Sequence, residues 1–476
     1  MQFEQASEPP SRWRDLVVND RLPKFALVCA GTWLTAADEL MTATIMPSAA
    51  HDIGGYAWFG WAVAAFLLGS ILGGATAGRL SVRAGLRPAL AIGGGAYALG
   101  CAASALAPSI SWFLLGRLLQ GLGGGWVVGL CYVAVTALFP QQVWARLFSA
   151  LAGVWGAATL ISPLIGGLFA EAGIWRGAFW LFAAQGLGFI AAAWVLIKAQ
   201  PAPPKQASGP PPYSQALALT VSVVAIGAAG LWPTALEAAV SAAFGLAVFG
   251  LFLWLDRESA SRLLPRSAAD PRSAAGAGLL MIFSLQAATI AFSVYGSALL
   301  QTLHHTRPIL AGYILGGSAL AWTAAALGVA GRRADKLFIR LGSAIIFLTL
   351  IGLAAVMPHG GLAPIALFVM AQGSGFGLAW SFTASRIVAN SPEAERAFAS
   401  SAMPTAQMIG AAVGAAAAGA IANMLGFGQG ITPTRASLAG FWLFASFAPL
   451  ALIGCLAAWR LTAVGVSASQ LGEAPL

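Results

Sequence analysis

Apolar stretches dominate the chain, and they are too long for globular strands and do not alternate with polar positions. The stretch from Ala57 to Ala77, for example, holds no charged residue. A helix needs roughly 20 such residues to cross the hydrocarbon core of a bilayer, which is about 30 Å thick. Barrel strands would give short alternating segments instead. The pattern predicts an all-α polytopic membrane protein with fourteen spanning helices, whose cores we place at residues 25–47, 57–77, 89–107, 113–136, 148–170, 177–197, 214–233, 236–255, 276–299, 309–330, 341–357, 362–384, 399–424 and 438–459.

The basic residues indicate how these helices are oriented. If the N-terminus is cytoplasmic, 21 of the 25 lysines and arginines fall on the cytoplasmic side. Arg176, Arg307 and Arg435 fall outside, and Arg117 lies within an apolar run. Cytoplasmic loops of membrane proteins carry an excess of Lys and Arg. We therefore expect a multi-pass protein of the inner or plasma membrane with both termini in the cytoplasm, and a first apolar run that is retained as an anchor.

The middle of the chain differs from its flanks. Residues 201–212 read PAPPKQASGPPP, a composition typical of a linker. The two predicted helices that follow have almost no polar stripe, and we expect them to face lipid. The predicted organisation is a cytoplasmic segment (1–24), a six-helix bundle (25–197), a linker with two accessory helices (198–274), a second six-helix bundle (275–462) and a cytoplasmic tail (463–476).

Composition excludes several other classes of protein. Only 9% of the residues are charged and 59% are hydrophobic, whereas soluble domains carry about 25% charged residues. The net charge of +9 is confined to short segments between apolar runs, which argues against a nucleic-acid partner. The four cysteines lie in apolar runs without metal-ligand spacing. No phosphate-binding loop or enzyme motif is present in the sequence, so we expect neither ATP, nor a cofactor, nor a metal, nor catalysis.

Three charged residues lie well inside predicted helices, away from the helix ends. Asp38 and Glu39 are near the middle of the first helix, and Arg117 is in the fourth. A charge at this depth is costly, by roughly 2.5–3.5 kcal/mol on insertion scales, so it pairs, faces a polar cavity or carries a proton. We predict proton coupling for all three, through an Asp38–Arg117 interaction that weakens when Asp38 is protonated. The alternative is a purely structural clamp between helices.

Other polar and aromatic residues in the helices suggest a substrate cavity. Asp38 shares a helical face with Gly31, Thr35 and Thr42, which predicts a stripe facing that cavity. An aromatic cavity with one acidic group suits lipophilic cations. The predicted cavity residues are Thr35, Thr42, Gln120, Trp155, Gln286, Thr289, Ser293, Tyr295, Trp322, Gln372, Trp380 and Gln407.

Several motifs follow one another over the first 180 residues. The first helix reads DELMTATIMPSAAHDIGG, and the segment from Gly78 to Pro88 reads GRLSVRAGLRP. Later come RLLQGLGGG around Arg117, SPLIGG with Pro163, Gly166 and Gly167, and the dipeptide Trp175–Arg176. Together they resemble the fourteen-helix drug:proton antiporter branch of the major facilitator superfamily.

The resemblance extends to two gating loops. Gly78, Arg83, Gly85 and Arg87 match the superfamily's basic loop, but Val82 stands where the family has an aspartate that latches the cytoplasmic side. Asp335 supplies an acidic residue at the equivalent place in the second half, in the segment GRRADKLFIR. The paired loops indicate a transporter built from two parallel repeats.

The resemblance implies the major facilitator fold and a function. We expect a monomeric proton-coupled antiporter, driven by the proton gradient, that exports small amphipathic or lipophilic compounds, cationic ones in particular, by alternating access. One alternative keeps the fold but carries a lipid or a metabolite. Another is a transport-inactive receptor or scaffold, which would give no reason for buried Asp38 and Arg117.

Overall fold

The structure, a computed structural model, describes residues 21–198, 212–259, 261–329, 332, 334–391 and 396–463. Over these residues it contains helices and no strands. The first bundle comprises α1 (Arg21–Ile53), η2 (Tyr56–Trp58), α2 (Phe59–Ala84), α3 (Leu86–Ala105), α4 (Ile110–Leu138), α5 (Gln141–Glu171) and α6 (Trp175–Leu196). The linker contains α7 (Tyr213–Ala228), η3 (Ala229–Leu231), α8 (Ala235–Glu258) and η4 (Arg266–Ala269). The second bundle comprises α9 (Ala274–His304), α10 (Pro308–Val329), α11 (Asp335–Val356), α12 (Leu362–Ala389), α13 (Arg396–Met424), η6 (Phe427–Gln429), α14 (Pro433–Ala445) and α15 (Ala448–Ala463).

The predicted fourteen spans are present. Thirteen helical segments among the described residues are long and apolar enough to cross a membrane. The fourteenth is α1, which has 33 residues and is less apolar because it carries Asp38 and Glu39. The last predicted span is interrupted between α14 and α15, just before Pro449, which has no backbone N–H to donate, but both pieces lie in one apolar segment, Pro433–Ala463.

Polar side chains start several helices where the sequence changes from loop to apolar run. Thr234 and Glu237 form a capping box at the start of α8, and Ser273 caps α9 by accepting a hydrogen bond from the backbone of Gly276. Such caps supply partners for the first N–H groups of a helix, which have none inside it.

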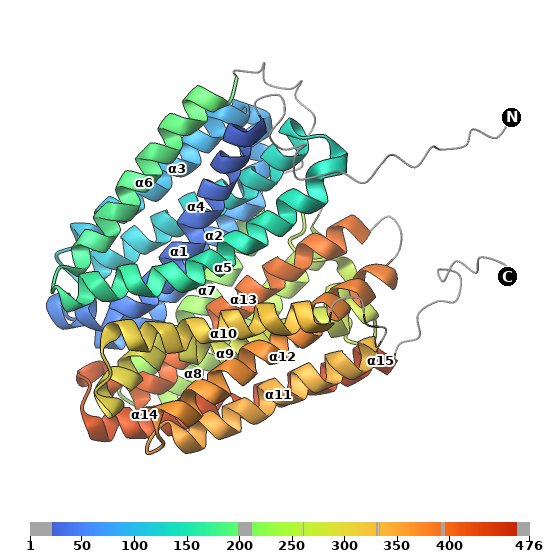
Figure 1. Ribbon diagram of the computed structural model, residues 1–476. Coiled ribbons are helices and arrows are strands. Elements are labelled where there is room, and N and C mark those ends of the chain that lie inside the picture. The colour runs from blue at the N-terminus through green and yellow to red at the C-terminus, as the bar shows by residue number, and fades with distance from the viewer. Residues whose placement is uncertain are drawn as a thin grey trace, which may run out of the picture.

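The helices form two bundles that lie side by side (Figure 1). In the first, α4 packs against α2 and α3, and α1 against α5; in the second, α12 packs against α10 and α11, and α9 against α13. Glycines allow these close crossings: a Cβ at Gly69 or Gly73 of α2 would overlap the backbone of α4. Gly74 and Gly78, further along α2, face open space.

The two accessory helices have different environments. Helix α8 is largely exposed, as expected for a lipid-facing helix. Helix α7 is not, because it packs between α8 and α13 and also touches α2. Ser222 donates to the Gly245 carbonyl of α8 at 2.8 Å, and a Cβ at Gly230, just after α7, would meet the backbone of Ala420 in α13. The prediction of a lipid-facing helix is therefore wrong for α7, because its small residues let it pack at the seam between the bundles.

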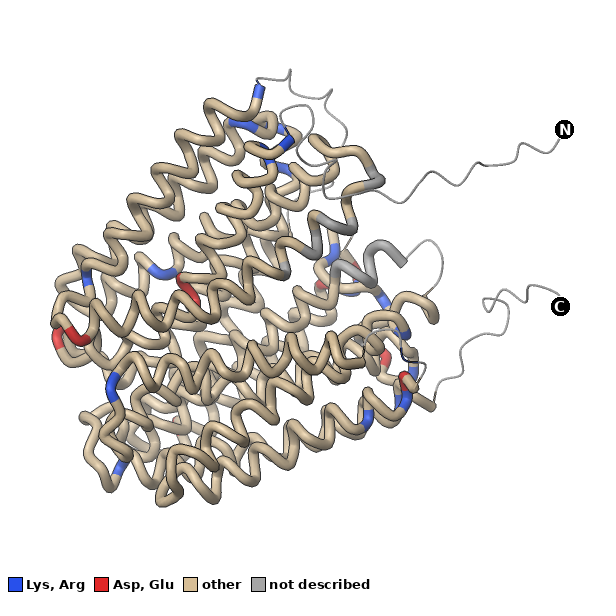
Figure 2. Tube along the Cα trace, in the orientation of Figure 1, with Lys and Arg blue, Asp and Glu red and all other residues tan. Residues whose placement is uncertain are grey.

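Two close contacts between the described parts of the bundles lie at one end of the molecule. Helix α1 begins and α15 ends on the same face of the molecule, here called the terminal face (Figure 1). On the opposite face, Gly60 of α2 lies against the backbone of Ala415 and Gly419 in α13, and Asn423 donates to the Ala57 carbonyl at 2.8 Å. Most described Lys and Arg residues lie towards the terminal face (Figure 2). Placing that face in the cytoplasm remains a prediction.

Candidate functional site

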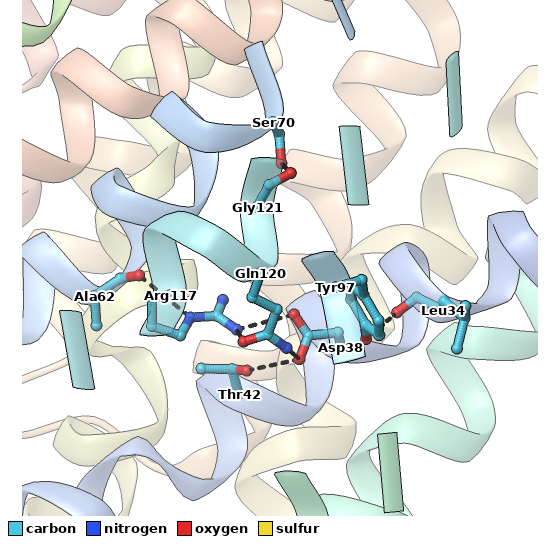
Figure 3. Close-up of polar contacts among 9 residues, drawn as sticks. All are labelled: Leu34, Asp38, Thr42, Ala62, Ser70, Tyr97, Arg117, Gln120 and Gly121. Atoms are coloured by element: carbon cyan, nitrogen blue, oxygen red, sulfur yellow. Dashed lines mark hydrogen bonds and ion pairs between the residues drawn. The ribbon is translucent and has the colours of Figure 1, made fainter. Parts of the chain in front are cut away.

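A buried ion pair joins α1 to α4 in the first bundle (Figure 3). Arg117 Nη1 lies 2.9 Å from Asp38 Oδ2, and Gln120 Nε2 donates to Asp38 Oδ1 at 2.7 Å. Thr42, one turn further along α1, donates to the same Oδ1 at 3.4 Å. At most 2% of either charged side chain is exposed. Both carboxylate oxygens of Asp38 therefore have donors in a site closed to solvent.

Polar and aromatic groups other than Asp38 also contact the Arg117 guanidinium. Its Nη1 donates to Gln120 Oε1 at 2.9 Å, and its Nε lies 3.5 Å from the Ala62 carbonyl oxygen of α2. The guanidinium carbon is 4.4 Å from the centre of the Phe66 ring. An arginine at membrane depth requires such partners, and three helices supply them here.

Glycines fix the turn of α4 that carries Arg117. A Cβ at Gly121 would overlap the Phe66 backbone in α2, and one at Gly123 would overlap the Tyr97 backbone in α3. Small residues at helix interfaces allow backbones to approach closely inside membranes. Tyr97 itself is buried and donates to the Leu34 carbonyl of α1 at 2.9 Å. The surrounding helices thus hold Arg117 on the side of α4 that meets Asp38.

Asp38 and Thr42, two residues of the polar stripe of α1, do not face the space between the bundles; for them the prediction of a cavity-facing position is wrong. Asp38 has no exposed surface and Thr42 is 2% exposed, while a Cβ at Gly31 would meet Cys131 of α4. This part of the stripe faces α4 because Arg117 and Gln120 offer Asp38 polar partners that lipid and apolar side chains do not.

Glu39 has a different environment from Asp38. Adjacent residues on a helix point about 100° apart, and Glu39 is partly exposed. No hydrogen bond or ion pair joins it to a described residue. The two neighbouring carboxylates therefore differ: Asp38 is neutralised by Arg117 inside the bundle, whereas Glu39 forms no ion pair with a described residue.

A cavity of about 620 Å³ lies beside the ion pair, between α2 and α4 of the first bundle and α13 of the second. The cavity lies nearer the terminal face than the contact at Gly60 does. At the level of the cavity, α2 and α4 are apart from α13. Thr35, one turn from Asp38, contributes to it from α1. The lining comprises Thr35, Ser70, Ile71, Gly74, Ala75, Arg79, Gly125, Val128, Gly129, Tyr132, Pro212, Ser261, Arg262, Leu263, Pro404, Thr405 and Met408.

Of the predicted cavity residues, Thr35 is the one that lines this cavity. Thr42 and Gln120 belong to the ion-pair site. In the second bundle, Gln407 of α13 donates to Gln286 of α9 at 3.2 Å, which ties these two helices together. Tyr295 is fully buried, with its ring stacked on Phe59 across the seam between the bundles.

The remaining predicted cavity residues are scattered. Trp322 stacks on Phe376 at 5.0 Å and lies 5.7 Å from Trp380. Gln372 is 5% exposed, and Trp155 of α5 is 41% exposed. Thr289 donates to its own helix at Leu285 O, and Ser293 is partly exposed. Residue type alone did not distinguish helix-packing residues from cavity residues.

A family model described as Major Facilitator Superfamily matches residues 28–371 of this sequence. The chain belongs to the major facilitator superfamily. It is 29% identical over 484 residues to a probable multidrug-efflux transporter of Mycobacterium tuberculosis, a match that covers 96% of this chain and 98% of that protein. Its fold resembles that of a nucleoside transporter (TM-score 0.66, 14% identity, covering 93% of this chain and 100% of that one). It also resembles a peptide transporter of the POT family in complex with 5-aminolevulinic acid (TM-score 0.64, 16% identity, covering 94% and 97%).

Membership of the superfamily makes this chain a multi-pass membrane transporter rather than an enzyme. The predicted gating loop of its first half is mostly helical: α2 continues through Gly78 and Arg83 to Ala84, and α3 begins at Leu86. Gly85 alone breaks the helix, with a φ of 83°, a conformation that favours glycine. Arg87 lies over the Trp194 ring at 3.9 Å.

The second half of the transporter keeps an ion pair at the equivalent place. Asp335, at the start of α11, accepts a hydrogen bond from Arg386 Nε of α12 at 2.5 Å. Arg386 also donates to the Leu461 carbonyl of α15 at 3.2 Å, and 5% of its side chain is exposed. Val82, which stands at the corresponding position of the first half, has no charge with which to form such an ion pair.

The antiporter-like motif of α5 forms part of the contact at the opposite face. A Cβ at Gly166 would meet the Met41 carbonyl of α1, and one at Gly167 would overlap Ile309 of α10. A Cβ at Gly312 of α10 would meet Pro163 in turn. The motif residues thus bring α1, α5 and α10 together.

Two ion pairs on the opposite face were not predicted as pairs. Asp52 at the end of α1 contacts Arg176 and accepts a hydrogen bond from Trp175 Nε1 at 3.1 Å. Glu171 of α5 pairs with Arg307, in the loop before α10, at 2.5 Å. The hydrogen bond and charge of Glu171 raise the pKa of Arg307. Each partner was visible in the sequence, but nothing local indicated which residue it would meet.

Proposed function

We propose that this transporter is a proton-coupled antiporter that exports small amphipathic compounds by alternating access. The observation that carries the proposal is the solvent-excluded Asp38–Arg117 pair, at 2.9 Å, beside a cavity that lies between the bundles. The similarity of the chain to a probable multidrug-efflux transporter supports export as the direction of transport.

The same two helices contribute to both the ion pair and the cavity. Helix α1 supplies Asp38 and Thr35, and α4 supplies Arg117 and Tyr132. A neutral Asp38 would no longer balance the charge of Arg117, and α1 and α4 would lose their strongest polar contact. We infer that proton binding at Asp38 changes the relative position of the two helices, and with it the cavity wall.

The described arrangement corresponds to one state of the transport cycle. The bundles touch at Gly60 and Gly419 on the opposite face, and the cavity lies on the terminal side of that contact. If the terminal face is cytoplasmic, this is the state that takes up a compound from the cell. Release outside then requires the Gly60 contact and the Glu171–Arg307 pair to separate.

Reconstituted protein tests this function directly. Proteoliposomes that contain a pH-sensitive dye should report a proton flux when ethidium is added to the wild type, and none for Asp38→Asn at equal incorporation. Asp52→Asn, which alters a carboxylate at the molecular surface, is the matched control and should keep the flux. A normal flux in Asp38→Asn would contradict the coupling.

A second candidate, a lipid or metabolite transporter, is favoured by the charges in the cavity. Arg79 and Arg262 line it, and the described lining includes no Asp or Glu. A cationic cargo would have no opposite charge within this lining. Competition between ethidium and a long-chain fatty acid separates the candidates: strong competition by the fatty acid, together with its own proton-coupled transport, would favour the second.

A further inference from the structure

Part of the cavity wall comes from the accessory segment rather than from either six-helix bundle. Pro212 precedes α7, and Ser261, Arg262 and Leu263 follow α8. The other lining residues come from α1, α2, α4 and α13. The polypeptide that joins the bundles therefore contacts the space in which the proposed substrate would sit.

The loop after α8 is fixed by specific hydrogen bonds. Asp256 is 2% exposed, and its two carboxylate oxygens accept hydrogen bonds from the backbone N–H groups of Leu263 at 2.7 Å and Leu264 at 2.9 Å. A buried carboxylate is tolerated when its oxygens have donors. Asp256 thereby folds the loop back onto the end of its own helix.

Two further bonds attach this loop to neighbouring helices. Arg79 Nη2 of α2 donates to Ser261 Oγ at 3.0 Å, and Gln215 Nε2 of α7 donates to the Ser261 carbonyl at 3.2 Å. Leu263 is 9% exposed, and with Ile71 of α2 it also lines a second, smaller gap. The loop is held on three helices, which a mere spacer between two bundles would not require.

We propose that Ser261 and Leu263 are specificity-determining residues of the transport cavity, and that the accessory segment thereby limits the size of the amphipathic compounds that fit. The proposal rests on the transport function proposed above. Leu263 presents an apolar surface next to Ile71, and Ser261 presents a hydroxyl group next to Arg79. This combination suits a compound whose apolar body lies against Leu263.

Two substitutions of opposite size test the proposal. Leu263→Trp should reduce the efflux of a bulky probe, the octyl ester of rhodamine, about 10-fold more than that of the methyl ester, because pocket shape discriminates by such factors. Leu263→Ala should shift the preference the other way. The matched control is Leu251→Trp, on the exposed side of α8, which should change neither. Equal losses for both probes, or no change, would overturn the proposal.

A labelling experiment keeps the result independent of the proposed function. Leu263→Cys should react with a charged, membrane-impermeant thiol reagent applied to the terminal face, at least about ten times faster than Leu251→Cys, since ionised reagents do not enter lipid. Absence of labelling would show that the residue does not border an aqueous cavity and would refute its place in the cavity wall. If wild-type protein moved neither rhodamine ester while Leu263→Cys was labelled, the proposed function would be contradicted. The conclusion that Leu263 lines the cavity would remain supported.

Discussion

Removing one partner of the Asp38–Arg117 pair should be far more damaging than removing both. Asp38→Asn leaves Arg117 with Gln120 and the Ala62 carbonyl, but without a countercharge in a site with at most 2% exposure. Leaving one member of a buried pair unbalanced typically costs about 3–5 kcal/mol. Arg117→Gln leaves the Asp38 carboxylate equally unbalanced, so a similar loss of stability is expected for it.

The double variant Asp38→Asn/Arg117→Gln removes both charges and keeps side chains that can hydrogen-bond. Its loss of unfolding free energy should be smaller than that of either single variant, so it should fall short of the sum of the two single losses by more than about 3 kcal/mol, the typical cost of one unbalanced buried charge. Unfolding of the purified protein by sodium dodecyl sulfate in mixed micelles measures this. Additivity within about 0.5 kcal/mol would show that the pair contributes no coupling.

Transport by the same double variant separates a structural clamp from a proton carrier. If the pair only clamps α1 to α4, restored stability should restore ethidium efflux driven by a pH gradient. If Asp38 carries the proton, as proposed, the double variant should be folded and should bind ethidium. Its rate of ethidium efflux should be the same with and without the pH gradient. Recovery of gradient-driven efflux would refute the role of Asp38 in coupling and leave the clamp as its function.

Three further variants test other features of the structure. Glu39→Gln should leave the unfolding free energy nearly unchanged, because Glu39 has no bonded partner among the described residues, and should alter the pH profile of efflux; an unchanged profile would remove Glu39 from the mechanism. Gly60→Ala should push α2 away from α13 and increase the labelling of the protein by reagents applied to the opposite face. Gly95→Ala, where an added Cβ meets nothing, should not change this labelling. Tyr97→Phe loses the bond to Leu34 and should cost about 1 kcal/mol of stability with efflux retained; lost efflux would imply a further role.

Much of the fold followed from local sequence, because a bilayer imposes a length and an apolar composition on every crossing helix. The fourteen spans were predicted with errors of a few residues, apart from the break before α15. Asp38 and Arg117 stood out for the same reason, since a charge in an apolar run is costly wherever the helix points. The family resemblance rested on short motifs such as the one around Pro163, which is also local.

The partners of these residues depended on helix packing, which no local pattern contains. The sequence pattern predicted that Asp38 and Thr42 face the cavity, whereas in the structure they meet α4, whose glycines let α2 and α3 close around Arg117. Packing likewise put α7 at the seam and brought Leu263 into the cavity wall. Hydropathy determines which segments enter the membrane; only the fit of side chains between helices decides which faces meet there.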